Sequence, residues 1–173
     1  MVIACRACGI GWREGTEPLC HHPDHEHSRH ERHRHRTPVV LPSGTVVWAA
    51  SFEESEADNY ARDAAPSFGL YFDEKWTPPW DHEVVPFPDF GVPSDVDLLR
   101  QHLAAVLVRA RAGERIELGC WGAHGRTGTA VACLAVLDGL VPDTAVAWVR
   151  DNYCARAIET ADQEAFVAAF PTT

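Results

Sequence analysis

Lysine is almost absent from the chain, and acidic residues outnumber basic ones. Lys75 is the single lysine among 15 basic residues, against 25 acidic ones, and the formal net charge of the 173 residues is −10. A protein that binds nucleic acid along its phosphate backbone needs a net basic face. The charge balance therefore argues against broad nucleic-acid binding, and any bound anion must be held at a local site.

Long apolar stretches are also missing. No run of about 18 uncharged apolar residues is present, and the first residues, MVIACRACGIGWREG, lack the basic flank and apolar stretch of a signal peptide. The sequence thus predicts no membrane partner and a cytoplasmic location. In that compartment the six cysteines, at positions 5, 8, 20, 120, 133 and 154, indicate metal binding or catalysis before disulfides.

The composition changes near residue 37. Residues 21–36 (HHPDHEHSRHERHRHR) hold seven of the ten histidines and hardly any apolar side chains, so this stretch cannot pack a core. The remaining length is enough for one globular domain with one core. We therefore predict a Cys/His-rich N-terminal segment over 1–36 and a catalytic domain over 37–173.

The N-terminal segment has the spacing of a zinc site. A C-x2-C knuckle is followed after eleven residues by C-H-H, which suits one tetrahedral Cys3His site, and zinc would supply the folding energy that the segment lacks in apolar residues. His21 and His25 compete for the fourth position, and the alternative is a histidine tract that binds metals without specificity. The predicted ligands are Cys5, Cys8, Cys20 and His22.

From Pro38 onward the pattern alternates between strands and helices. The β-branched runs VVLP and TVVWAAS, split by Ser43 and Gly44, predict a hairpin. A helix is expected from Ser94, after Pro93, to Gly113. This order predicts an α/β fold with a central, mostly parallel sheet flanked by helices. Further strands are predicted at 68–72, 83–87 and 115–118, and further helices at 52–64, 127–137, 143–153 and 160–170.

The segment ELGCWGAHGRTGTAVACLAVL is typical of an anion site. It places Cys120 at the end of a strand, Arg126 six positions later, and an apolar helix directly after. A short loop that closes into a helix N-terminus points backbone N–H groups and the positive end of the helix dipole at one spot. A thiol there can have its pKa lowered from about 8.5 to about 3.5–7.5, and a thiolate is a good nucleophile toward phosphorus. Arg126 would bind two phosphate oxygens, and the Thr127 hydroxyl would hydrogen-bond the sulfur.

This C-x5-R-T-G loop between a strand and a helix resembles the signature loop of the cysteine-dependent protein tyrosine phosphatase superfamily. PFPDFGVP at 86–93 resembles the mobile acid loop of that family, which implies that Asp89 is the general acid. ETADQEAFVAAF at 159–170 resembles the segment in which a glutamine positions the attacking water, here Gln163. The resemblance covers residues 82–170 and implies a phosphatase-like fold that needs no cofactor for catalysis.

The loop departs from the family pattern at two places. Gly119 stands where the family usually has histidine, and Gly122-Ala123 stands where it commonly has alanine and then glycine. His124 would either add positive charge for a more acidic substrate or be an ordinary surface histidine. The phosphate-binding residues implied by the resemblance are Trp121, Gly122, Ala123, His124, Gly125 and Arg126.

The expected activity is hydrolysis of a phosphate monoester through a cysteinyl-phosphate, with a phosphorylated protein as substrate, as in tyrosine or dual-specificity phosphatases. One alternative keeps the chemistry but acts on a small molecule or a phosphorylated RNA end. Another is a catalytically silent phosphate-binding or zinc-dependent adaptor. Of the other candidates, Glu159 and Asp162 are interpreted as first-turn helix charges, and Cys154 as a packed thiol.

Overall fold

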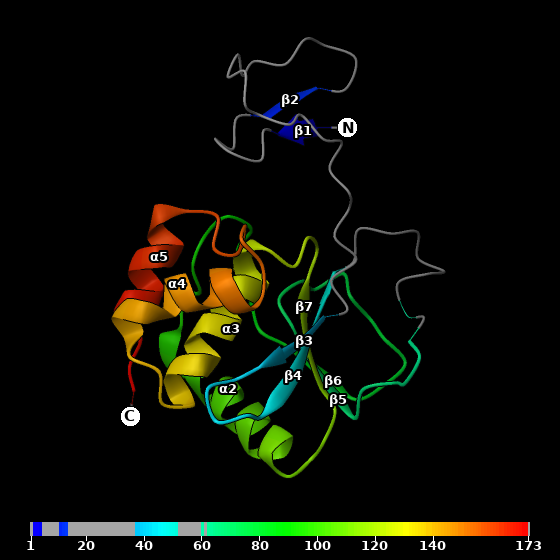
Figure 1. The fold of residues 1–173 in the computed structure, drawn as a ribbon. Helices are drawn as coiled ribbons and strands as arrows, with labels where there is room; N and C mark the ends of the chain where they lie inside the picture. The colour runs from blue at the N-terminus through cyan, green and yellow to red at the C-terminus, as the bar shows by residue number, and fades with distance from the viewer. Residues whose placement is uncertain (1, 5–10, 14–36, 52–59, 61, 173) are drawn as a thin grey trace. The chain divides into compact units, whose positions relative to one another are not determined.

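Figure 1 shows the computed structural model of the chain, which describes residues 2–4, 11–13, 37–51, 60 and 62–172. The chain divides into two units, Met1–His33 and Arg34–Thr173. In the first, β1 (Val2–Ala4) pairs antiparallel with β2 (Gly11–Arg13). The predicted zinc ligands lie outside the described residues, so the zinc site stays a prediction: Cys5, Cys8, Cys20 and His22.

The second unit is built on a five-stranded mixed sheet of order β3-β4-β7-β5-β6. The edge strand β3 pairs antiparallel with β4, and the other three pairs are parallel, which confirms the predicted, mostly parallel α/β sheet. The predicted hairpin is the β3–β4 pair, whose turn contains Gly44 at φ +88°, a value that favours glycine. The strands are β3 (Thr37–Val40), β4 (Val46–Ser51), β5 (Phe68–Tyr71), β6 (His82–Val84) and β7 (Ile116–Cys120).

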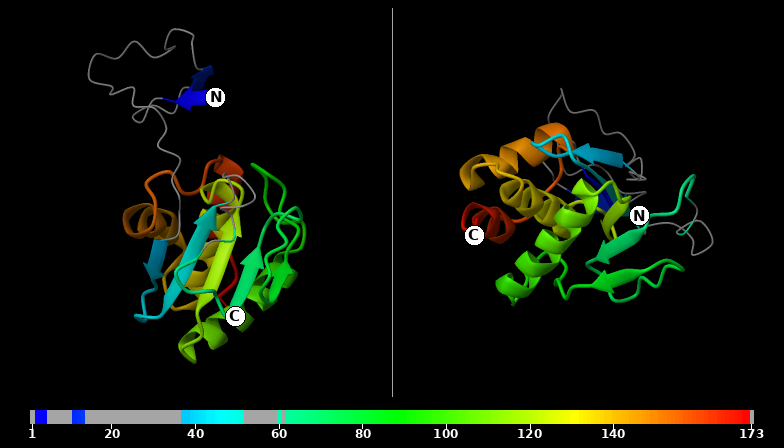
Figure 2. Two further views of the ribbon diagram at one scale, coloured as in Figure 1. Left: turned by 90° about the vertical axis from the view of Figure 1, so that its right-hand side faces the viewer. Right: turned by 90° about the horizontal axis from the view of Figure 1, so that it is seen from below.

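Four helices lie together on one face of this sheet, as the two views of Figure 2 show. They are α2 (Val96–Arg111), α3 (Gly125–Leu137), α4 (Pro142–Asn152) and α5 (Ala161–Ala168). Helix α3 contacts β7 as well as α2, α4 and α5. Its residues are therefore buried from Gly125 through Val136, and the apolar run that predicted the helix forms the centre of the core.

The opposite face of the sheet carries a second cluster, made of aromatic rings. Along β5, Leu70 packs with the helices, whereas Tyr71 packs with Trp76 on the other face. A Cβ on Gly69 would lie 2.3 Å from the Tyr71 ring, so only glycine fits beneath it. The Tyr71 hydroxyl donates to the buried carboxylate of Glu117 at 2.9 Å. Tyr60 and Trp80 cover this cluster at its rim.

Several predicted boundaries differ from the structure. Asp95, not Ser94, caps α2: its backbone is extended, and its carboxylate accepts a hydrogen bond from the Leu98 N–H at 2.8 Å. Helix α3 begins at Gly125, two residues before the predicted start, because it grows directly out of the loop. In the predicted helix at 52–64, residues 52–59 and 61 lie outside the described residues, and 62–64 are not helical.

The candidate catalytic residues converge at one edge of the sheet. Cys120 is the last residue of β7, and Phe72 and Asp73 directly follow β5, whose parallel neighbour is β7. The segment after β6 leads to Asp89. The carboxyl ends of parallel strands are the usual place for a ligand site in an α/β sheet.

Candidate active site

The loop between β7 and α3 closes within four residues, 121–124. Ala123 in this loop has φ +54°, a left-handed conformation that costs a non-glycine residue about 1–2 kcal/mol. Two contacts from the segment after α4 hold the loop in place: the Tyr153 hydroxyl donates to the Ala123 carbonyl, and the Ile158 N–H donates to the His124 carbonyl at 3.2 Å. The segment after α4 therefore stabilises the strained conformation of the loop.

The sulfur of Cys120 lies inside this loop. The Thr127 hydroxyl donates a hydrogen bond to it at 3.0 Å, as the sequence predicts, and the backbone N–H groups of Thr127 and Ala123 also point at it. Burial raises the pKa of the Cys120 thiol, whereas these hydrogen bonds and the charge of Arg126 act to lower it. The net pKa of the thiol is raised, so the predicted lowering is wrong for this structure: desolvation of the thiolate outweighs the hydrogen bonds and the charge of Arg126.

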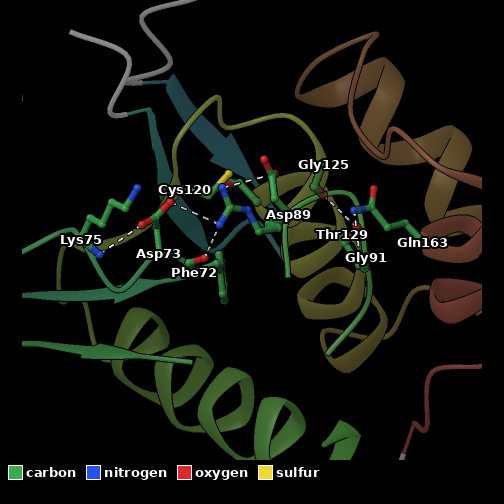
Figure 3. Close-up of polar contacts among 11 residues, drawn as sticks. Phe72, Asp73, Lys75, Asp89, Gly91, Cys120, Gly125, Thr129 and Gln163 are labelled. Atoms are coloured by element: carbon green, nitrogen blue, oxygen red, sulfur yellow. Dashed lines mark hydrogen bonds and ion pairs between the residues drawn. The ribbon is translucent and has the colours of Figure 1, made fainter. Parts of the chain in front are cut away.

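Arg126 is held on one side and open on another. Its Nη1 donates to the Phe72 carbonyl at 2.7 Å and to Asp73 Oδ2 at 3.3 Å, and its Nη2 lies 3.4 Å from Asp89 Oδ1 (Figure 3). Among the described residues, its buried Nε–H has no hydrogen-bond partner. Nη1 is occupied and Nη2 lies beside the exposed carboxylate of Asp89, so Nε is the donor without a described partner; the edge formed by Nε and Nη2 suits two oxygens of one phosphate.

Asp89 stands on a tight turn beside the phosphate loop. The Gly91 N–H donates to the Pro88 carbonyl at 3.1 Å, and Phe90 between them has φ +57°. The carboxylate side chain is 60% exposed although it contacts Arg126, so it faces solvent at the mouth of the site. The structure therefore brings together four of the predicted catalytic residues, Cys120, Arg126, Thr127 and Asp89.

Gln163 reaches this group through the acid loop. It is fully buried; its Nε2 donates to the Gly91 carbonyl at 3.0 Å, and its Oε1 accepts from the Glu159 N–H at 2.9 Å. Both ends of its amide are thus engaged by backbone groups. The predicted part in positioning water stays a prediction, while the contact in the structure is with the acid loop.

Glu159 is a site residue that the sequence did not predict. Its carboxylate accepts a hydrogen bond from the Gly125 N–H, and a Cβ on Gly125 would lie 2.4 Å from its Oε2. Partial burial and the negative charge of Asp89 raise the pKa of the Glu159 carboxyl. The missed signal was the cap: Thr160 caps α5 by accepting from the Gln163 N–H, which leaves Glu159 outside the helix and free to turn toward α3.

The other predicted phosphate-binding residues differ in how far their side chains are exposed. The His124 ring is buried, with Nδ1 3.4 Å from the sulfur of Cys154, so its side chain packs under the loop. Cys154 is accordingly a packed thiol beside the site. Trp121 is 52% exposed. Gly122 lies in the loop, and Gly125 is the first residue of α3.

A cleft of about 370 Å³ opens from Arg126. One wall is the segment after β5, with Asp73, Glu74 and Lys75, and the other is the start of the acid loop, from Val85 to Pro88. Within the described part of the chain, no group of three or more His, Cys, Asp or Glu side chains could hold a metal ion. No helix among the described residues is long and apolar enough to cross a membrane.

No protein-family model matches the sequence. Two uncharacterized proteins of Methanocaldococcus jannaschii are similar in sequence to this chain. MJECL20 is 38% identical over 85 residues, which are 48% of this chain and 54% of the relative. MJ0215 is 36% identical over 85 residues, 48% of this chain and 50% of the relative. The chain thus spans about half the length of these curated relatives.

Solved structures of phosphatases share the fold. Tk-PTP in its active form is 27% identical, with a TM-score of 0.56, over 68% of this chain and 85% of that one. The kinase associated phosphatase KAP is 16% identical, with a TM-score of 0.61, over 77% and 91%. The core catalytic domain of the PP-IP phosphatase SIW14 from S. cerevisiae is 18% identical, with a TM-score of 0.55, over 76% and 83%.

The fold is that of cysteine-dependent protein tyrosine and dual-specificity phosphatases, and the likeness to Tk-PTP at 27% identity supports membership of that superfamily. Its mostly parallel sheet and flanking helices match these structural neighbours, and the likeness supports a phosphatase enzyme. Phosphatases of this type need no cofactor for catalysis.

Proposed function

We propose that the protein hydrolyses phosphate monoesters through a cysteinyl-phosphate on Cys120. Two groups at the end of β7 and the start of α3 carry this proposal. The Cys120 sulfur accepts a hydrogen bond from the Thr127 hydroxyl, and the buried Arg126 has an Nε–H without a hydrogen-bond partner among the described residues. A nucleophile six residues before a buried guanidinium with this unpartnered Nε–H suits a tetrahedral oxyanion.

In the first step the thiolate of Cys120 attacks phosphorus. The S–P bond forms as the P–O bond to the leaving group breaks, and Asp89 donates its proton to the departing oxygen. Arg126 binds two of the three remaining phosphoryl oxygens through Nε and Nη2, and the N-terminus of α3 stabilises their charge.

In the second step water attacks the phosphorus of the intermediate. Asp89, now ionised, accepts a proton from the water, the P–S bond breaks, and inorganic phosphate leaves. The hydrogen bond from Thr127 stabilises the thiolate that is released. We infer that Gln163 holds Asp89 within reach of that water by fixing the Gly91 end of its loop.

The proposed substrate class is a phosphorylated protein, as for tyrosine and dual-specificity phosphatases. Two exposed aromatic side chains support it: Phe90 follows the acid, Trp121 follows the nucleophile, and they are 61% and 52% exposed. Exposed aromatic rings at a site mouth suit contact with an aryl group or a peptide. The cytoplasmic location and the N-terminal zinc site stay predictions of the sequence.

The test compares the wild type with Cys120→Ser on p-nitrophenyl phosphate, then on phosphotyrosine and phosphothreonine peptides, nucleotides and inositol phosphates. Loss of all turnover in the variant is expected, with tungstate binding retained because the loop and Arg126 remain. Cys133→Ala is the matched control, since Cys133 is also a buried thiol but lies in the core of α3. Turnover within tenfold of wild type in Cys120→Ser would refute the mechanism, and turnover of nucleotides alone would refute the protein substrate.

A further inference from the structure

A second pocket, of about 580 Å³, lies between the turn before β4 and the turn before β7. One wall carries Ser43, Thr45 and Val46, and the other carries Arg111 and Arg115. Both turns lie at the lower end of the sheet in the left view of Figure 2. The active site is at the opposite, carboxyl end of β7, which is about 16 Å away at about 3.3 Å per strand residue. The pocket is therefore separate from the catalytic loop.

Arg115 is a fixed cation in this pocket. Its Cζ lies 3.6 Å from the centroid of the Trp48 ring, so the planar guanidinium is stacked on the indole. Among the described residues, no hydrogen bond or ion pair engages this guanidinium. Its donors are therefore available to a ligand, and the stacking has already restricted their direction. Five other arginines of the described chain each pair with a carboxylate: Arg62, Arg100, Arg109, Arg111 and Arg150.

The walls of the pocket are held by paired charges. The carboxylate of Asp138 is fully buried and accepts from the Ser43 N–H and from Arg111 Nη2, each at 2.7 Å, which joins the β3–β4 turn to the end of α2. Glu114, the one carboxylate that lines the pocket, accepts from Nη2 and Nε of Arg109 at 2.7 and 2.9 Å. Both acidic groups are thus balanced, and among the described residues the stacked arginine is left as an uncompensated positive charge.

The pocket also has an apolar side. Val46 and Trp48 lie on the face of β4 opposite to Val47, which packs with the helices. Val46 is 39% exposed, and Trp48 is half-buried. At the rim, the hydroxyls of Ser43 and Thr45 lie 2.9 Å apart. An apolar wall with a few fixed polar groups, in a volume between about 300 and 1,000 Å³, is the usual form of a small-molecule site.

We propose that this pocket binds a small organic anion, a phosphate or carboxylate carried on an apolar or aromatic body. The guanidinium of Arg115 binds two oxygens of the anion through its planar pair of donors. The body of the ligand packs against Val46 and the exposed part of Trp48. The inference goes beyond the proposed function and does not depend on it, because no catalytic residue lines this pocket.

The experiment is a ¹⁵N NMR titration of the arginine Nε–Hε signals with phenyl phosphate and with benzoate. It uses Arg126→Ala, in which the catalytic loop has lost its phosphate-binding guanidinium. We expect saturable binding with a dissociation constant of about 1 mM or lower, and a shift of the Arg115 signal. The probe that binds more tightly shows whether the natural ligand carries a phosphate or a carboxylate. Inorganic phosphate should bind at least about fivefold more weakly than phenyl phosphate, because it lacks the apolar body.

Substitution of Arg115 in the same background tests the contact directly. Arg115→Gln removes the charge and should weaken binding of the tighter probe about tenfold or more, since a hydrogen bond to a charged group is strong. Arg115→Lys keeps the charge but loses the planar pair of donors, and should weaken binding about threefold or more. Because the lysine can still lie over the indole, this second variant serves if the first does not fold.

Arg100→Gln is the matched control. Arg100 is also an arginine of α2, but it lies outside the pocket, and its contact with Asp97 is a surface pair at 3.8 Å. This change should leave the affinity for either probe within about twofold. No saturable binding of either probe to Arg126→Ala, or unchanged affinity in the Arg115 variants, would overturn the inference. Turnover by the wild type tests the proposed function independently of these results.

Discussion

The side-chain amide of Gln163 donates a hydrogen bond to the carbonyl oxygen of Gly91 across 3.0 Å. This contact joins α5 to the loop that carries Asp89, and the two residues are 72 positions apart in the chain. The other end of the same amide accepts from the Glu159 N–H. A single buried side chain therefore couples the acid loop to the segment that packs against the N-terminus of α3.

Replacing Gln163 should make the loop that carries Asp89 less firmly held. Gln163→Met keeps the volume but leaves the Gly91 carbonyl and the Glu159 N–H without their partner. We expect a loss of about 2 kcal/mol in the free energy of unfolding and a drop in kcat that is larger for alkyl than for p-nitrophenyl phosphate. Urea unfolding and steady-state kinetics measure the two effects. The control is Asp162→Asn, an exposed neighbour, and an equal loss of kcat there would contradict the account.

Asp89→Asn should separate substrates by their leaving groups. An amide at this position cannot protonate the departing oxygen, so turnover of poor leaving groups should fall by about 10²–10⁴-fold. Substrates whose leaving group needs no proton should be affected far less. Binding of substrate should hold or improve, because a negative charge next to the phosphate is removed. Equal losses across a series of aryl phosphates would leave Asp89 as a turn residue only.

Thr127→Ala should slow the second step more than the first. Without the hydroxyl the thiolate is a poorer leaving group, and a hydrogen bond to a charged group contributes about 1.5–3 kcal/mol, which corresponds to about 10–100-fold in kcat. The intermediate should then accumulate as a pre-steady-state burst. Thr127→Ser keeps the hydroxyl and should restore kcat to within about threefold. A variant with unchanged kcat and no burst would contradict this role.

The carboxyl of Glu159 should titrate above its ordinary range. Its pKa is raised by burial and by the charge of Asp89, so in Asp89→Asn its midpoint, followed by carbon-detected NMR, should move down toward the ordinary value. A raised pKa means that the folded protein binds this proton more tightly than the unfolded chain. Glu159 therefore contributes stability that is present at low pH and is lost as the pH rises through the raised value. An identical midpoint in the two proteins would show that Asp89 does not act on it.

Much of the fold could be predicted because its patterns are local. The turn at Ser43 and Gly44, the apolar run of α3 and the helical spacing of α2 each lie within one segment. The aromatic cluster could not be predicted in this way, since the Tyr71 hydroxyl meets Glu117 only when β5 is placed beside β7, and Tyr60 joins the cluster from a separate segment. The sequence predicted the strand at 68–72 but not which of its residues faces which layer.

In the site, too, residues close together in the sequence could be predicted and distant partners could not. Cys120, Arg126 and Thr127 lie within eight consecutive positions, so their shared loop was readable, and Asp89 followed from the resemblance of its own segment. Asp73 and Glu159 were missed because each contacts the loop across the fold, 53 residues before Arg126 in the case of Asp73. Such partners depend on how distant segments pack together, which residue spacing does not reveal.

The central claim is a covalent phosphate on Cys120, and rapid acid quench tests it most directly. Wild-type protein is mixed with p-nitrophenyl phosphate, quenched within the first turnover, digested and examined by mass spectrometry. A phosphate adduct on the peptide that contains Cys120, enriched in Thr127→Ala and absent in Cys120→Ser, is the predicted result. Turnover with no adduct on Cys120 in either the wild type or Thr127→Ala, or an adduct on another residue, would contradict the account.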